Sequence, residues 1–161
     1  MPLTVGSLVS TASWTQTKTN TGRQDLTQGP DSTVGTVSFA VATVNRVYTY
    51  PISLAASATA TIDLQALTTL LGETDAWTKV QGILLTVDSG GGNIKLGQGA
   101  SNPLTWFFGG TTPTITVQAG GFFALGDGAT STVSSSVKTL KLTNLSGALT
   151  ATGQLILFGG T

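Results

Sequence analysis

The chain has 161 residues and a formal net charge of zero, and charged residues make up only 9% of it, against about 25% in an ordinary soluble domain. This composition indicates a surface that is largely covered by something else, and the lack of a basic excess argues against binding to nucleic acid. The sequence contains no His and no Cys, which excludes imidazole bases, thiolate nucleophiles, the usual zinc sites and disulfides.

Residues 1–33 predict an extended N-terminal arm, because the run from Ser10 to Gly22 after Leu8-Val9 is almost entirely polar. The stretch contains a single large aromatic residue, Trp14, and ends close to the turn-forming run Gly29-Pro30-Asp31. Because so few of its side chains are apolar, the arm cannot build a core of its own. We expect it to lie on another surface with Trp14 as an anchor; the alternative is an arm folded back onto its own domain.

Strand patterns begin at residue 34. Val37, Phe39 and Val41 alternate with smaller residues, which is the period of a half-buried strand. Further strands are expected over 44–50 and 52–62. We expect Pro51 to separate them because proline cannot donate a hydrogen bond to a strand ladder.

One short helix is predicted after these strands. Asp63 is expected to cap its N-terminus, Leu64, Leu67 and Leu71 to share one face, and Gly72 to end it. A helix of about two turns would cover one end of a sheet.

The rest of the chain is typical of short strands joined by glycine-rich turns. Residues 79–88 and 94–96 flank the run Asp88–Asn93 and predict a hairpin. Further strands are expected over 104–108, 114–117, 122–125, 132–137, 139–145 and 148–158. This pattern predicts an all-β protein, a two-sheet β-sandwich of jelly-roll type, as a single domain over residues 34–161. No segment approaches the ~20 apolar residues of a membrane-spanning helix.

No pattern of side chains predicts an active site, a metal site or a cofactor site. A glycosidase pair of carboxylates would have to use Asp88 and Asp127, which both adjoin glycine turns where Asp commonly forms the turn. Ser135 and Lys138 have the Ser-x-x-Lys spacing, but a strand there would point them to opposite faces. We therefore predict a non-enzymatic protein without a cofactor. Whether the loop 88–93 uses its oxygen atoms to bind a cation stays open.

The overall style of the chain resembles the virion structural proteins of tailed bacteriophages. It is rich in Thr, Ser, Gly and Ala, and its polar arm precedes a body expected to be a β-sandwich. The stretches that carry the resemblance are Tyr50–Leu54, Thr61–Leu64, Val80–Leu85 and Leu155–Thr161. The resemblance implies a capsid cement, or decoration, protein on the virion surface, made in the host cytoplasm. Such proteins commonly form homotrimers and clamp neighbouring capsid subunits.

A capsid clamp needs contact surface rather than reactive groups, which agrees with this composition. Uncharged Thr-rich faces lose water at a lower cost than charged faces, and an extended arm can add as a strand to a neighbour. The expected partners are the major capsid protein or other virion subunits, together with further copies of the chain. The residues expected to make these contacts are Leu3, Val5, Leu8, Val9 and Trp14.

A receptor- or carbohydrate-binding module of a phage tail or fibre is the alternative function. It would need an exposed row of aromatic side chains for stacking on sugars. In a sandwich, Trp77 and Trp106 are instead expected in the core or in a protein contact.

Overall fold

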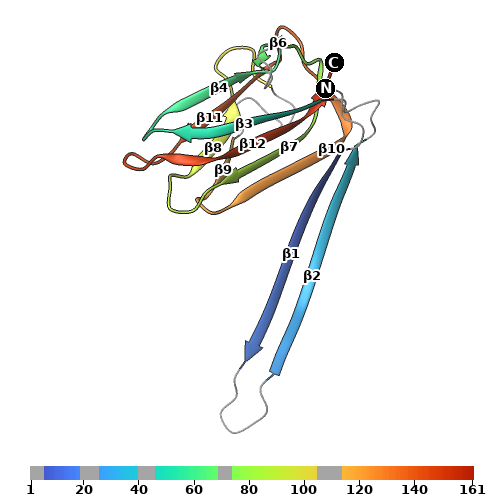
Figure 1. Cartoon of the computed structure of the whole chain (residues 1–161), viewed down its shortest axis with the longest axis vertical. Coiled ribbons are helices and arrows are strands. Elements are labelled where there is room, and N and C mark those ends of the chain that lie inside the picture. The colour runs from blue at the N-terminus through green and yellow to red at the C-terminus, as the bar shows by residue number, and fades with distance from the viewer. Residues whose placement is uncertain (1–5, 19–25, 40–45, 69–73, 105–113) are drawn as a thin grey trace.

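The computed structural model describes residues 6–18, 26–39, 46–68, 74–104 and 114–161. Side chains are described for residues 46–68, 74–97, 99–104, 114–126 and 132–161. This part of the chain is all-β (Figure 1), and it contains no helix long and apolar enough to cross a membrane. Its strands are β1 (Gly6–Lys18), β2 (Leu26–Phe39), β3 (Arg46–Leu54), β4 (Thr59–Asp63), β5 (Leu67–Thr68), β6 (Thr74–Asp75), β7 (Lys79–Val87), β8 (Ile94–Gln98), β9 (Thr114–Val117), β10 (Phe122–Thr132), β11 (Thr139–Asn144) and β12 (Ala151–Gly160).

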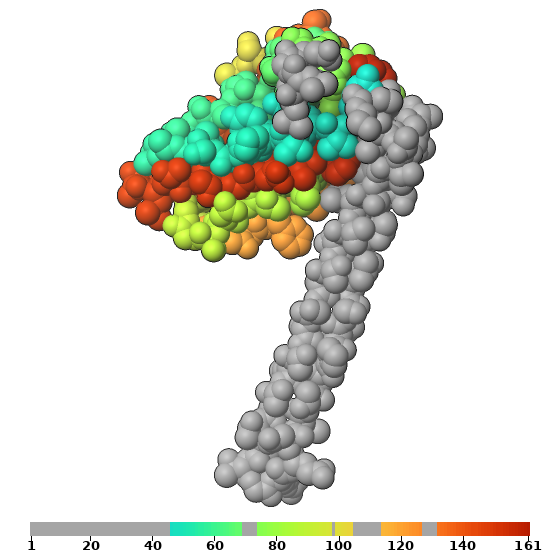
Figure 2. All heavy atoms as spheres, in the orientation of Figure 1, coloured from blue at the N-terminus to red at the C-terminus, as the bar shows by residue number. Residues whose placement is uncertain are grey.

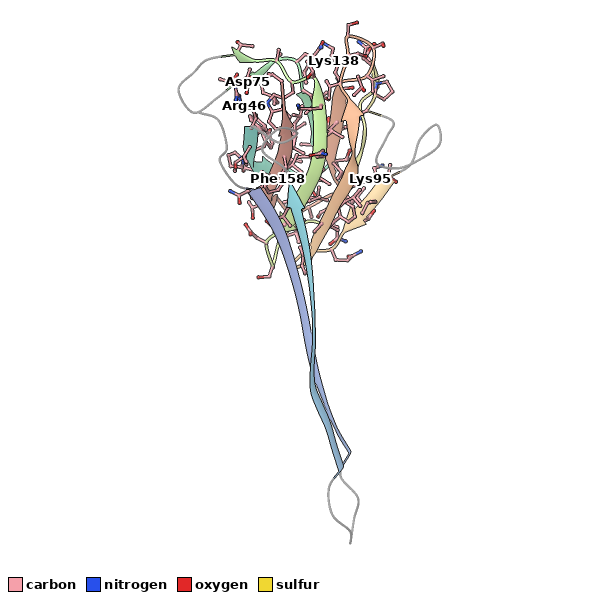
Figure 3. All side chains as sticks on the ribbon, turned by 90° about the vertical axis from the view of Figure 1, so that its right-hand side faces the viewer. Arg46, Asp75, Lys95, Lys138 and Phe158 are labelled. Carbon is pink, nitrogen blue, oxygen red and sulfur yellow. The ribbon has the colours of Figure 1, made fainter. Side chains whose placement is uncertain are left out.

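Two four-stranded antiparallel sheets form the body. Their strand orders are β10-β7-β12-β3 and β4-β11-β8-β9. Apolar residues of both sheets join one core cluster, so the sheets pack as two layers around a shared interior (Figure 3). Burial alternates along the middle of β12, where Leu155 and Leu157 are fully buried and their neighbours are less buried. Successive side chains of a strand point to opposite faces, so an apolar residue at every second position places one face in the core.

The β1–β2 hairpin stands apart from the two sheets. β1 pairs antiparallel with β2 from Gly6 opposite Phe39 to Lys18 opposite Leu26. Near its base the hairpin contacts β10, and from there it extends away from the body (Figure 1). The boundary expected between residues 33 and 34 falls inside β2, because this strand continues to Phe39.

The predicted helix is wrong for the residues of it that the structure describes. Leu64 to Ala66 form a turn and Leu67 begins β5; the expected helical positions Leu71 and Gly72 lie outside the described residues. The physical reason is competition from a distant backbone group. The Leu64 carbonyl, which a helix would pair with the amide four residues later, accepts from the Trp77 amide instead. The Leu64 amide, which has no partner within a helix at that first position, donates to the Lys138 carbonyl.

The predicted break at Pro51 is also wrong, since β3 runs through it and Pro51 stands opposite Gln154. β3 is an edge strand and has a ladder on one side only. A proline whose missing N–H faces away from that ladder removes no hydrogen bond.

The hairpin predicted over residues 79–96 does not form. β7 pairs with β10 and β12, whereas β8 pairs with β9 and β11 in the other sheet. The loop between them therefore carries the chain across the core. A glycine-rich loop predicts a change of direction, but it does not specify which strand edge is available on the other side.

The predicted strand 132–137 is replaced by a turn. β10 extends to Thr132, and Ser134 and Val137 exchange two backbone hydrogen bonds of 3.0 and 3.1 Å. The strand expected over 104–108 lies outside the described residues apart from Leu104.

Candidate functional site

Reactive side chains do not gather at any point in the described part of the chain. No three His, Cys, Asp or Glu side chains there are placed to hold a metal ion. The Ser-x-x-Lys spacing falls on a turn in which Ser135 is exposed, and Lys138 Nζ donates to Asp63 Oδ2 at 2.7 Å. Lys138 therefore serves as the partner of a carboxylate at this position.

The Asp63–Lys138 ion pair fixes the turn that replaces the predicted helix. Burial by itself would raise the pKa of the Asp63 carboxyl. Hydrogen bonds from Lys138 and from the Gln65 amide, together with the Lys138 charge, outweigh that effect and hold this pKa below its ordinary value. Asp63 thus ties β4 to the segment that enters β11.

A second ion pair lies where the body begins. Arg46 Nε is 3.3 Å from Asp75 Oδ2, and the same oxygen accepts a hydrogen bond of 3.1 Å from Trp77 Nε1. Trp77 is 1% exposed, which confirms its expected place in the core. Arg46 and Asp75 lie side by side in Figure 3, so the first residue of β3 is linked to a buried anchor.

The opposite end of the sandwich is formed by four loops, which we call the loop end. The loops are residues 55–58, 88–93, 118–121 and 145–150. Asn144, 1% exposed, links the first and the fourth of these loops. Its Nδ2 lies 2.7 to 3.0 Å from the carbonyl oxygens of Leu54, Ala55 and Leu149, and its Oδ1 accepts from the Ser146 amide. These bonds brace the two loops against each other.

Asn93 braces the glycine-rich loop in the same way. Its side-chain Oδ1 accepts from the Ala119 amide and its backbone oxygen accepts from the Leu145 amide, both at 2.9 Å. Both oxygen atoms of Asn93, which were candidates for binding a cation, therefore already accept hydrogen bonds from backbone amides. The loop 88–93 acts as a structural link between neighbouring loops.

The surface of the loop end is almost free of charge. Asp88 is the one charged residue within its four loops. Leu145 and Leu149 on these loops are 46% and 51% exposed, and Phe122, which follows the third loop, is 58% exposed. Such a surface can enter a protein contact without the cost of removing water from charged groups.

The residues expected to make contacts fall on the hairpin or before it. Leu8, Val9 and Trp14 lie on β1, opposite Val37, Thr36 and Asp31 of β2. Leu3 and Val5 lie outside the described residues. The hairpin thus brings three of the five expected residues onto one strand.

The sequence interpretation placed a strand from residue 34 onward, which covers the end of β2, but it missed the start of β2, the pairing of β2 with β1 and the exposed apolar residues of the body. Glycines before Phe122 and after Ser146 mark turns, but exposure depends on which loops meet at one end of the sandwich. The hairpin was missed because β1 is rich in Thr and Ser and the first half of β2 contains the turn-forming run Gly29-Pro30-Asp31, so the apolar alternation that identifies a strand is weak there.

Comparisons of the chain with protein-family models, with curated proteins and with solved structures each find no match.

Proposed function

We propose that this protein is a non-enzymatic structural subunit of a virus particle, a capsid cement protein that acts as a homo-oligomer. It binds the major capsid protein or other virion subunits and stabilises the shell. The observation that carries this proposal is the β1–β2 hairpin, which leaves the body and extends beyond it (Figure 1).

A projecting hairpin of this length is suited to contact with a neighbour. β1 has 13 residues and β2 has 14, so the ribbon spans roughly 40 Å. A two-stranded ribbon in water is marginally stable by itself, and both of its outer edges offer backbone groups to a further strand. A partner that covers the ribbon satisfies these groups and gains a wide contact area.

The body supports the same proposal through its strand order. The first strand of the sandwich, β3, neighbours the last, β12, and the second, β4, neighbours the next to last, β11. This nesting supports the proposal that the body is a sandwich of jelly-roll type, an architecture that is common in viral capsid proteins and in lectins.

The described aromatic residues do not favour the alternative of a carbohydrate-binding module. Trp77 is buried, and Tyr48 and Tyr50 pack against the core. Among the side chains that the structure describes, Phe122 is the one strongly exposed aromatic group, and a single ring does not form a stacking row.

Binding to capsid shells that lack this protein tests the proposal. The full chain should sediment with such shells and raise their resistance to heating. Trp14→Asp should weaken binding at least tenfold, because it places a charge within the hairpin contact. Thr116→Asp adds the same charge on the exposed surface of β9 and should bind as the unmodified chain does. Equal binding by both variants would show that the hairpin is not the contact element, and a failure of the unmodified chain to bind shells would contradict the cement function.

A further inference from the structure

β10 forms an open edge of the body. It pairs with β7 on one side, from Phe122 opposite Thr86 to Gly126 opposite Gly82, and it ends the sheet on the other side. In Figure 2 its orange atoms lie along the lower border of the body. Charged side chains and prolines usually keep a sheet edge from accepting another strand. The segment Phe122–Gly126 contains neither.

One hydrogen bond shows which backbone groups face outward along this edge. The Val87 amide donates to the Gly121 carbonyl at 2.9 Å, so the carbonyl of Gly121 points toward β7. Because backbone groups of successive residues in a strand point to alternate sides, the amide and carbonyl groups of Phe122, Ala124 and Gly126 point away from β7. These groups are the ladder positions that an added strand would use.

The other edges of the two sheets are protected. β3 carries Arg46 and Pro51, and β4 has five residues and ends at Asp63. β9 has four residues. β10 carries Asp127 and a register irregularity between Gly126 and Ser131, so its open part is Phe122–Gly126, a stretch of sheet edge that has neither a charge nor a proline.

β1 is the complementary strand. It contains no proline, and it carries no charge before Lys18, whereas β2 contains Pro30 and Asp31. β1 thus keeps every backbone donor along an uncharged edge, as the open part of β10 does. The hairpin contacts β10 of its own chain near the hairpin base and from there extends away from the body (Figure 1), so most of β1 does not lie along β10 of its own chain.

We propose that β1 of one copy adds as an outer strand to Phe122–Gly126 of β10 in a second copy. The ribbon then extends the four-stranded sheet of its neighbour, and the open edges of both elements become paired. This inference rests on the proposed role of the hairpin as a contact element, and it names the partner of that element as another copy of the same chain.

Solution mass and hydrogen exchange of the full chain test this pairing. Ala124→Pro removes an outward amide that the β7 ladder does not use, and Ala124→Lys places a charge on the same edge. Both variants should retain the circular dichroism of the unmodified chain and sediment as single chains of about 16.3 kDa, whereas the unmodified chain sediments as an oligomer. Thr116→Lys is the matched control on the edge strand β9, and it should remain oligomeric.

Hydrogen exchange then identifies the strand that docks. In the unmodified oligomer, amides of β1 should exchange at least tenfold more slowly than in Ala124→Lys, although the substitution is on β10. A single-chain mass for the unmodified protein, oligomers that survive both Ala124 substitutions, or unchanged exchange in β1 would each overturn the inference. Slow exchange of β1 only on capsid shells would identify a capsid subunit as the occupant, which overturns the inference and leaves the cement function standing. Oligomers that show the expected exchange but do not bind shells would contradict the cement function alone.

Discussion

The backbone of Gly159 lies directly against the indole ring of Trp77. A Cβ atom added at Gly159 would come within 2.8 Å of two ring atoms, Cε3 and Cζ3, and would also meet the Lys79 carbonyl oxygen. Trp77 is fully enclosed and hydrogen-bonded through its Nε1 to Asp75, so the ring has little room to move. Gly159 is therefore required at this place for the indole to fill the end of the core.

Substitution of Gly159 by Ala should lower the free energy of unfolding by about 1–3 kcal/mol, the usual effect of overfilling a packed site. Chemical denaturation measures this change. Gly147→Ala is the control, because a Cβ at Gly147 meets no atom within 4 Å. Equal stability of the two variants would show that the indole can shift without cost.

Asn144→Asp should lower the free energy of unfolding by at least about 2 kcal/mol, because it removes the amide donor from buried carbonyl groups and introduces a buried charge. The variant also tests whether Asn144 braces the loop end, since amides of residues 145–150 should exchange faster with solvent. Asn102→Asp makes the same chemical change at an exposed residue and should have little effect on stability. A small effect of Asn144→Asp would mean that water replaces the lost donor.

The Asp63–Lys138 pair should make stability depend on pH in acid. The pKa of Asp63 is lower in the folded protein than its ordinary value of 3.8. The contribution of this pair to the free energy of unfolding is therefore complete at pH values above the ordinary pKa of Asp63. It is lost as the pH falls through the lower pKa of Asp63 in the folded protein. Both side chains are partly exposed, at 23% and 33%, so the contribution should be about 1 kcal/mol or less.

Thermal unfolding of Lys138→Met at pH 7 and in acid measures this contribution. The variant should be less stable than the unmodified chain at pH 7, and the difference should shrink as the pH falls below the ordinary pKa of Asp63. Lys141→Met removes the same charge from β11 and should show a smaller change with pH. The prediction fails if the stability differences of the two variants from the unmodified chain change with pH by the same amount.

Pro51→Val should increase self-association of the protein. Proline at this position leaves the outer edge of β3 without one donor, and valine restores a donor that another strand can use. Light scattering at increasing protein concentration measures the effect. Ser53→Val changes a residue of the same strand without adding an amide, and it separates the restored donor from greater hydrophobicity. Comparable scattering by the two variants would mean that Pro51 does not protect this edge.

Local patterns in the sequence determined the all-β class and most strand positions in the body. β7, β9, β11 and β12 coincide closely with predicted strands. In β9, β11 and β12 apolar residues recur at every second position along one buried face, and β7 contains a short continuous apolar run. The lack of His and Cys likewise limits the chemistry of the chain through composition alone, whatever fold it adopts.

The tertiary structure alone decided which backbone groups pair. Leu64 and Leu67 satisfy a helical pattern, yet Lys138 and Trp77 take the backbone groups of Leu64. The glycine-rich run after β7 predicts a hairpin, yet Asn93 links it to the loops at Ala119 and Leu145. Such bonds join residues that are far apart in the chain, so no short stretch of sequence indicates that they form.

The tertiary structure also decided where the low charge of the chain produces an uncharged surface. A net charge of zero and 9% charged residues indicate a covered surface, but they do not say where it lies. The two sheets gather the loop end into one surface with a single charge and leave Phe122–Gly126 of β10 as an open, uncharged edge. Composition is a property of the whole chain, whereas a contact surface exists only where folding brings its parts together.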